Sequence, residues 1–312
     1  MDVDLSTELA GLRLPNPLMT ASGCAAAGRE LHQFFDIAEL GAVVTKSVMR
    51  GVRSGRPTPR MAETPSGMLN SIGLQGPGID DFIAHDLPWL QSVGARAVVS
   101  IAGGDVAEFA GLAARLVDQP GVAAVEVNIS CPNVANRGLV FACDPASSSA
   151  VVSAVRSMLP QHIPLLAKLS PDVTDIVAIA AACLAAGADG LTMINTLLGM
   201  SIDLDEMRPR LAGLTGGLSG PAVRPVAVRC IWQVHAAMLD GRLPPAPIVG
   251  VGGVRTGRDA LELVLAGASA VQVGTVTFND PSAPLRVRNE LAHELATRGV
   301  TRFADVVGRA HH

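Results

Sequence analysis

The chain of 312 residues contains no tyrosine, and only Lys46 and Lys168 among its 24 lysines and arginines are lysines. Its five cysteines form an odd set without a C-x-x-C pair. This pattern excludes a disulfide framework and argues against a zinc or iron–sulfur site built from this chain alone. We therefore expect a reducing compartment and no bound metal.

The sequence also lacks long apolar runs, a targeting segment and basic clusters. The longest apolar run, residues 176–188, is shorter than the roughly 20 residues that a membrane span requires. The first residues show no signal-peptide pattern. The net charge is −4, and no basic cluster alternates with aromatic residues. We expect a soluble, cytoplasmic protein that binds a small molecule and contacts neither membrane nor nucleic acid.

The main pattern that is present is an alternation of short β-branched runs with helical stretches. Eight such units predict a parallel sheet covered by helices, and hence a single (β/α)8 TIM barrel over residues 1–312. The long connections 48–96 and 196–223 are expected to be active-site loop insertions. The predicted strands are residues 17–22, 42–47, 97–102, 122–128, 164–170, 190–195, 247–252 and 270–275, and the helical intervals include 106–119, 174–187, 224–239 and 257–267.

Polar residues or glycines follow nearly every predicted strand. Barrel enzymes carry their chemistry at the carboxyl ends of the strands, so we expect these residues to meet at one pocket. They are Ser22, Lys46, Ser47, Ser100, Asn128, Cys131, Lys168, Asn195, Thr196, Gly252, Gly253, Gly274 and Thr275.

The two lysines and the last glycines suggest a cofactor. Each lysine lies in an apolar run, where a buried ammonium needs a partner or a task. The glycines after the last two strands, with the helix start that follows Gly253, favour a phosphate site. A phosphate site near a cation such as Lys168 suggests flavin mononucleotide (FMN). A Schiff-base role for Lys168, as in a lyase, is the alternative.

Several asparagines point to the kind of ligand. Residues 63–78 are Gly-rich and contain Asn70, and Asn128, Asn133 and Asn195 add amides that donate and accept hydrogen bonds. Such a set suits a small planar pyrimidine- or urea-like ligand. A turn-forming role explains Asn133 equally well.

The segment EVNISCPN places Cys131 just after the fourth strand. A nucleophilic role needs an adjacent base and a metal-ligand role needs further ligands, and neither is present among the residues expected at the pocket. A proton shuttle remains, since a free thiol has a pKa of about 8.5. The alternative is a small buried hydrophobe, which fits Cys183 and Cys230, and Cys24 is a second candidate for the base.

Seven motifs, in this order, resemble the dihydroorotate dehydrogenase family: GMLNSIGLQ, NISCPN, AKLSP, TMINTLLGM, TGGLSGPA, GVGGV and ASAVQVGT. GLQGPG, GLVFACDP and NTLLGMSIDL are most similar to its soluble NAD-linked type, the class 1B catalytic subunit. The resemblance implies oxidation of (S)-dihydroorotate to orotate in de novo pyrimidine biosynthesis. FMN would take the hydride, and Cys131 would be the general base.

The same resemblance implies two sets of binding residues. Orotate would be held by Lys46, Asn70, Ser71, Ile72, Gly73, Leu74, Asn128, Asn133, Asn195 and Thr196. FMN would be held by Ser22, Lys46, Ser47, Ser100, Asn128, Lys168, Ile194, Gly220, Gly252, Gly253, Gly274 and Thr275. Ser100 stands where the family commonly has a flavin-contacting asparagine, so its shorter side chain must reach the ring or act through water.

The resemblance also implies partners and alternatives. The chain would form a homodimer, or a heterotetramer with a subunit that carries FAD and a 2Fe–2S cluster and reduces NAD+. The second enzyme hypothesis is a flavin barrel similar to dihydropyrimidine dehydrogenase. Lys46, as an anchor for a substrate carboxylate, favours dihydroorotate dehydrogenase over it. The hypothesis without enzyme activity is a flavin-binding scaffold. Such a scaffold is expected to have lost the general base and the substrate-binding amides, and both are present in this sequence.

Overall fold

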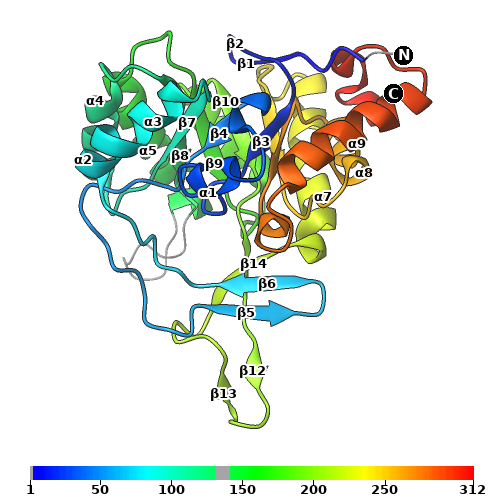
Figure 1. Cartoon of the computed structure of the whole chain (residues 1–312). Helices are drawn as coiled ribbons and strands as arrows, with labels where there is room; N and C mark the ends of the chain where they lie inside the picture. The colour runs from blue at the N-terminus through cyan, green and yellow to red at the C-terminus, as the bar shows by residue number, and fades with distance from the viewer. Residues whose placement is uncertain (1–2, 131–140) are drawn as a thin grey trace.

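A computed structural model describes residues 3–130 and 141–312, and its centre is a closed barrel of parallel strands (Figure 1). The eight-stranded sheet has the order β3-β16-β15-β10-β9-β8-β7-β4, and a parallel bridge between Met19 and Ala42 joins its two edges. The predicted (β/α)8 barrel is therefore confirmed. Its strands are β3 (Leu18–Thr20), β4 (Val43–Val44), β7 (Ala97–Ile101), β8 (Val122–Asn128), β9 (Leu165–Leu169), β10 (Gly190–Met193), β15 (Ile248–Val251) and β16 (Ala270–Val273).

Helices cover the outside of the barrel. Three of them begin directly after an aspartate whose carboxylate accepts a bond from a first-turn amide, as in Asp105 with Glu108 N, which fixes where each helix starts. The main helices are α3 (Leu87–Ser92), α4 (Val106–Leu116), α5 (Pro145–Met158), α6 (Ile176–Ala185), α7 (Arg224–Leu239), α8 (Gly257–Leu265) and α9 (Ala283–Thr297), with short α1 (Arg29–His32), α2 (Ile79–Asp81) and a π-helical turn, η2 (Phe82–Asp86). Within the described residues, none is long and apolar enough to cross a membrane.

The inside of the barrel changes from apolar to polar along the strands. At the amino ends, residues such as Ala124, Leu166 and Ala270 form a small apolar cluster. Leu9 and Leu14, from the hairpin of β1 (Thr7–Leu9) and β2 (Leu12–Leu14), belong to the same cluster and close this end. Since side chains alternate across a strand, the residues two positions further along also point inward. The carboxyl half of the barrel interior therefore receives polar side chains.

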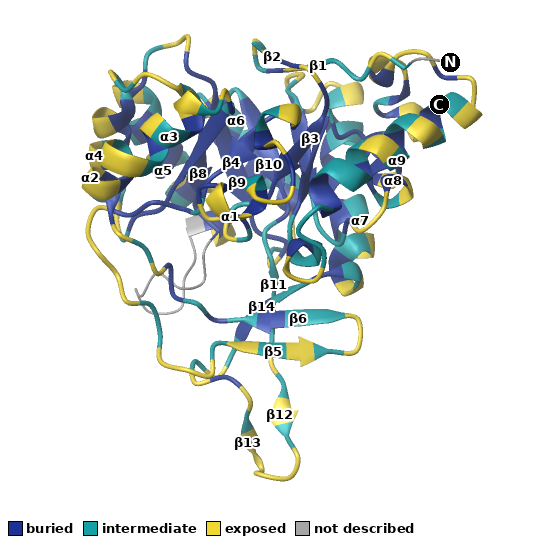
Figure 2. Cartoon of the chain, viewed as in Figure 1, coloured by how far each residue is buried: buried dark blue, intermediate teal, exposed yellow. Residues whose placement is uncertain are grey.

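A second, smaller sheet projects beyond the carboxyl ends of the strands. Its order is β11-β14-β6-β5, from β5 (Met61–Thr64), β6 (Gly67–Asn70), β11 (Leu197–Gly199) and β14 (Gly216–Ser219). The hairpin of β12 (Ile202–Asp203) and β13 (Arg208–Pro209) extends furthest from the barrel (Figure 1). Figure 2 shows that much of this projection is exposed or half-buried, whereas the barrel strands are buried. The two long connections predicted as loops thus pair with each other as antiparallel strands.

Candidate active site

A cavity of about 710 Å³ opens at the carboxyl ends of the strands, beneath the projecting sheet. Both elements that the sequence predicts for this end, the ends of the barrel strands and the two long connections, contribute to its lining. The predicted site residues that line it are Ser22, Lys46, Ser47, Asn70, Ile72, Leu74, Asn128, Lys168, Ile194, Asn195, Thr196, Gly220, Gly252, Gly253, Gly274 and Thr275. Ser71, Gly73 and Ser100 lie outside this lining, while Cys131 and Asn133 lie outside the described residues.

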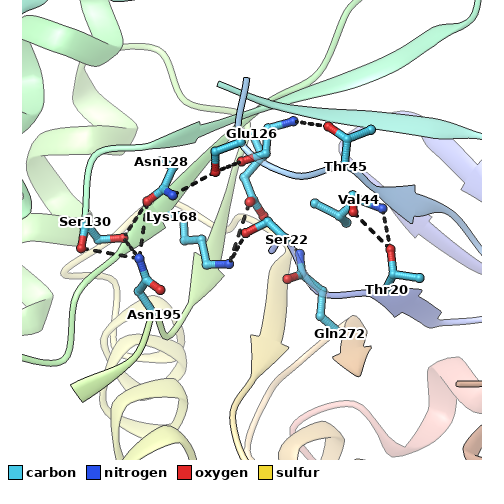
Figure 3. Close-up of polar contacts among 12 residues, drawn as sticks. Thr20, Ser22, Val44, Thr45, Glu126, Asn128, Ser130, Lys168, Asn195 and Gln272 are labelled. Atoms are coloured by element: carbon cyan, nitrogen blue, oxygen red, sulfur yellow. Dashed lines mark hydrogen bonds and ion pairs between the residues drawn. The ribbon is translucent and has the colours of Figure 1, made fainter. Parts of the chain in front are cut away.

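Hydrogen bonds join the amide side chains at one side of the cavity (Figure 3). Asn128 Nδ2 donates to Ser47 Oγ at 2.9 Å, and Asn195 Nδ2 donates to Ser130 Oγ at 2.8 Å. Ser130 Oγ in turn donates to Asn128 Oδ1 at 3.2 Å, which connects the two asparagines. The network fixes the orientation of both amides before any ligand binds. Ser130 was not predicted as a site residue.

Ser100 lies behind this network. It is fully buried, and its hydroxyl is 2.9 Å from Ser47 Oγ. Ser100 does not line the cavity, whereas its partner Ser47 does. In this structure Ser100 therefore reaches the cavity only through its contact with Ser47.

Lys168 is the buried cation of the site. Its Nζ donates to Ser22 Oγ at 3.0 Å and lies 3.7 Å from Glu126 Oε1. Gln272 Nε2 donates to Glu126 Oε2 at 3.0 Å. Glu126 and Gln272 were missed in the sequence, although each lies at an inward-facing position, two residues after Ala124 and Ala270. Strand alternation was the signal that would have identified them.

Glycines form the wall at the last two strands. A Cβ at Gly252 would lie 2.8 Å from Ala227 Cβ, and one at Gly253 would lie 2.7 Å from Arg224 Cβ. Gly253 also has φ of +73°. Within the described part of the chain, no backbone hydrogen bond uses the N–H groups of Gly252, Gly253 or Gly274. The wall therefore offers free amide donors, which suit an anion.

The start of α8 does not share in this anion site. Asp259 Oδ2 accepts hydrogen bonds from the amides of Arg255 and Thr256, both at 2.9 Å, and Glu290 Oε2 accepts from Gly257 N at 2.8 Å. These carboxylates occupy the amides that the sequence argument assigned to a phosphate. In this structure these three amides are therefore bonded to Asp259 of α8 and Glu290 of α9.

The segment from Asn70 to Leu74 forms another part of the cavity wall, to which Asn70, Ile72 and Leu74 contribute. Asn70 Nδ2 donates to Gly217 O at 3.3 Å, which ties β6 to β14. Ser71 is buried, and Arg56 Nη1 donates to its hydroxyl at 3.3 Å. Gly73 and Leu74 both have positive φ, 80° and 55°. Arg56 thus stabilises a strained turn whose alternate residues face the cavity.

Two cysteines are buried in the core and a third lines the cavity, as the sequence suggests. Cys183 and Cys230 are fully buried in the hydrophobic core, and burial raises the pKa of the Cys183 thiol to about 12. Cys24 lines the cavity, and burial raises the pKa of its thiol against the opposing effects of Lys168 and Lys46. A raised pKa makes Cys24 a poor base near neutral pH.

The fold and cavity define a (β/α)8-barrel protein whose cavity lies at the carboxyl ends of the strands, where barrel enzymes carry their active sites. The chain belongs to the dihydroorotate dehydrogenase family, whose model, described as "Dihydroorotate dehydrogenase", matches residues 4–295. Membership of this family implies a flavin cofactor.

Two relatives show how far the similarity extends. A protein of Pelobacter propionicus is 50% identical over 308 residues, which cover 99% of each chain. One of Geobacter sulfurreducens is 49% identical over 305 residues, 98% of this chain and 97% of the relative. Both are named "Dihydroorotate dehydrogenase B (NAD(+)), catalytic subunit", a name that indicates a partner subunit in those proteins.

Proposed function

We propose that this chain oxidises (S)-dihydroorotate to orotate in de novo pyrimidine biosynthesis, as the catalytic subunit of an FMN-dependent, NAD+-linked enzyme. The observation that carries the proposal is the cavity, which combines free glycine amides, a buried cation and oriented asparagine amides in a chain of this family. We also propose that residues 1–312 form one FMN-binding domain.

The cavity fits FMN in three respects. The free N–H groups of Gly252, Gly253 and Gly274, with Thr275 and Gly220 beside them, would hold the phosphate end. Lys168 would lie at the electron-accepting part of the ring, with Ser22, Lys46, Ser47, Asn128 and Ile194 around it, and Ser100 would act through Ser47. Gln272 Oε1 is buried without a hydrogen-bond partner among the described residues, although Gln272 lines the cavity. Such an acceptor suits a ligand with an N–H group.

The remaining residues suit a substrate with one carboxylate and a cyclic urea. Lys46 supplies the cation for the carboxylate, together with the turn from Asn70 through Ser71, Ile72 and Gly73 to Leu74. Asn128, Asn195 and Thr196 supply donors and acceptors for the ring. Asn133 is proposed as a further contact on the sequence alone. The hydrogen bonds among Asn128, Ser130 and Asn195 hold these amides ready, which lowers the entropic cost of binding.

Bound FMN would supply the acceptor for a hydride from C6 of the substrate. The chain must then remove a proton from C5, and we propose Cys131 as this base. Cys131 directly follows Ser130, which is bonded to Asn128 and Asn195 of the cavity wall. Loss of hydride from C6 and of a proton from C5 leaves the double bond of orotate, and the proton converts the Cys131 thiolate into the thiol.

We further propose a homodimer, and a heterotetramer with a subunit that carries FAD and a 2Fe–2S cluster and reduces NAD+. The hairpin of β12 and β13 supports self-association, because it exposes large apolar side chains that are costly in water. Leu204 and Met207 are 83% and 86% exposed. Sedimentation of the purified chain tests the dimer: a monomer at micromolar concentration contradicts it.

The proposed reaction is tested with the purified chain in the absence of oxygen. We expect a yellow protein whose visible absorption is bleached by dihydroorotate, and FMN in the supernatant after heat denaturation. 5,6-Dihydrouracil, which lacks the carboxylate, should bleach it far more slowly. A colourless protein that takes up no FMN, or a bound flavin that dihydroorotate leaves oxidised, would refute the proposal. Faster bleaching by dihydrouracil than by dihydroorotate would favour the dihydropyrimidine dehydrogenase hypothesis.

A further inference from the structure

Glu126 is a buried carboxylate that the proposed reaction does not use. It lies on β8 two residues before Asn128, and none of its surface is exposed. Leaving an ionised carboxylate inside a barrel is costly unless charge and hydrogen bonds compensate. Its surroundings therefore indicate what it does.

Two residues compensate Glu126, and both belong to the cavity wall (Figure 3). Lys168 Nζ lies 3.7 Å from Oε1, which has the charge of the ammonium nearby but no hydrogen-bond partner among the described residues. Gln272 Nε2 donates to Oε2 at 3.0 Å. Lys168 Nζ also donates to Ser22 Oγ at 3.0 Å, so the ammonium is held between Ser22 and Glu126. The three strands β8, β9 and β16 thus form one polar cluster inside the barrel.

Glu126 itself is hidden from the cavity. Lys168, Gln272 and Ser22 line the cavity, whereas Glu126 does not. A ligand can therefore sense the carboxylate only through its electric field and through the side chains that it positions. Glu126 thus lies as a counter-ion behind Lys168, the cation that lines the cavity.

Stability alone is a weak reason for such a pair. Replacement of a buried ion pair by apolar groups of similar volume is often neutral or stabilising. The apolar cluster at the amino ends shows that this barrel is filled by residues such as Ala124 and Leu166 elsewhere. Charge near the cavity distinguishes this part of the barrel.

We propose that Glu126 is a positioning residue that sets the electrostatic potential at the flavin through Lys168. This inference rests on the proposed flavin site. Reduction adds electron density to the flavin, and a nearby cation favours it. The Glu126 carboxylate offsets part of that effect and holds the ammonium against Ser22. Removal of the negative charge alone should therefore make the flavin easier to reduce.

The test is the midpoint potential of bound FMN in the full chain, measured by anaerobic titration with reference dyes. We expect Glu126→Gln to raise the ratio of reduced to oxidised flavin about tenfold at a fixed ambient potential. For a two-electron couple this is about 30 mV. Glu126→Asp keeps the charge and should stay within about twofold of the wild type. Glu126→Met, of similar size and uncharged, is a second variant should Glu126→Gln fail to fold.

Thr192→Val is the matched control. Thr192 pairs with Lys168 in the sheet register, and its hydroxyl is buried without a hydrogen-bond partner among the described residues. The substitution alters a neutral group beside the same lysine, so the potential should not change. Thermal unfolding of each apoprotein reports the structural effect separately.

The outcomes separate this inference from the proposed function. A wild-type chain that binds no flavin would refute both the proposed function and the role of Glu126. A flavin-bound wild type whose potential is unchanged or lowered by Glu126→Gln or Glu126→Met overturns only the role of Glu126. A loss of thermal stability without a change in potential also overturns it, because Glu126 would then be purely structural.

Discussion

Gly253→Ala tests whether the glycine wall binds the phosphate end of FMN. In the structure Gly253 has φ of +73°, a left-handed conformation that costs an alanine about 1 kcal/mol. The new Cβ would also lie 2.7 Å from Arg224 Cβ and 2.9 Å from Gly220 O. Both contacts are too short, and such overpacking costs about 2 kcal/mol. The loop should relax and move the Gly253 amide.

FMN binding must then restore the original geometry at a total cost of about 3 kcal/mol, which weakens binding by about 100-fold. Titration of the apoprotein with FMN, followed by quenching of flavin fluorescence, measures this change. Gly299→Ala is the control, because Gly299 has φ of +71° but nothing within 4 Å of its added Cβ. It should lose about 1 kcal/mol of stability in urea unfolding and bind FMN normally. An FMN affinity of Gly253→Ala within threefold of the wild type would refute the assignment.

Three further predictions concern single side chains. Cys131→Ala should slow anaerobic bleaching by dihydroorotate about 100-fold or more and leave FMN bound, because it removes the proposed general base. Cys24→Ala should change the rate little. An unchanged rate in Cys131→Ala would show that another group is the base. Asp189→Asn should lower the free energy of unfolding in urea by about 2 kcal/mol, because Asp189 Oδ2 accepts from Arg156 at 2.9 Å and from Leu165 N at 2.8 Å; equal stabilities would contradict this. Burial lowers the pKa of His235 in the folded chain, so protonation favours unfolding and the melting temperature should fall as pH drops below about 6.5. His235→Gln should weaken that fall, and a slope equal to that of the wild type counts against it.

The strands of the barrel could be predicted because their signal is local. Each is a short run of buried apolar residues bounded by glycine or polar residues, as in residues 164–170 for β9. The polar residues at the strand ends then follow from the topology, since parallel strands of a barrel end on one side. The cavity contains Lys46, Asn128, Lys168 and Asn195 for that reason.

The projecting sheet could not be predicted in the same way. β6 pairs with β14, and the residues in contact, such as Asn70 and Gly217, are far apart in the chain. Their strands are only four residues long and half-buried, so neither shows a strong periodic pattern. Their pairing is a long-range contact that only the folded chain brings about.

The sequence by itself determined the barrel, its polar rim and the family, because alternation of strands and helices and contiguous motifs are local properties of the chain. The tertiary structure decided which charges meet. Glu126, Lys168 and Gln272 come from three strands, and their pairing depends on side-chain direction and distance inside the closed barrel. Likewise, Asp259 accepts hydrogen bonds from two amides at the start of α8, which a sequence pattern alone assigns to an anion. Both results depend on distances and directions between side chains in space, which no linear pattern contains.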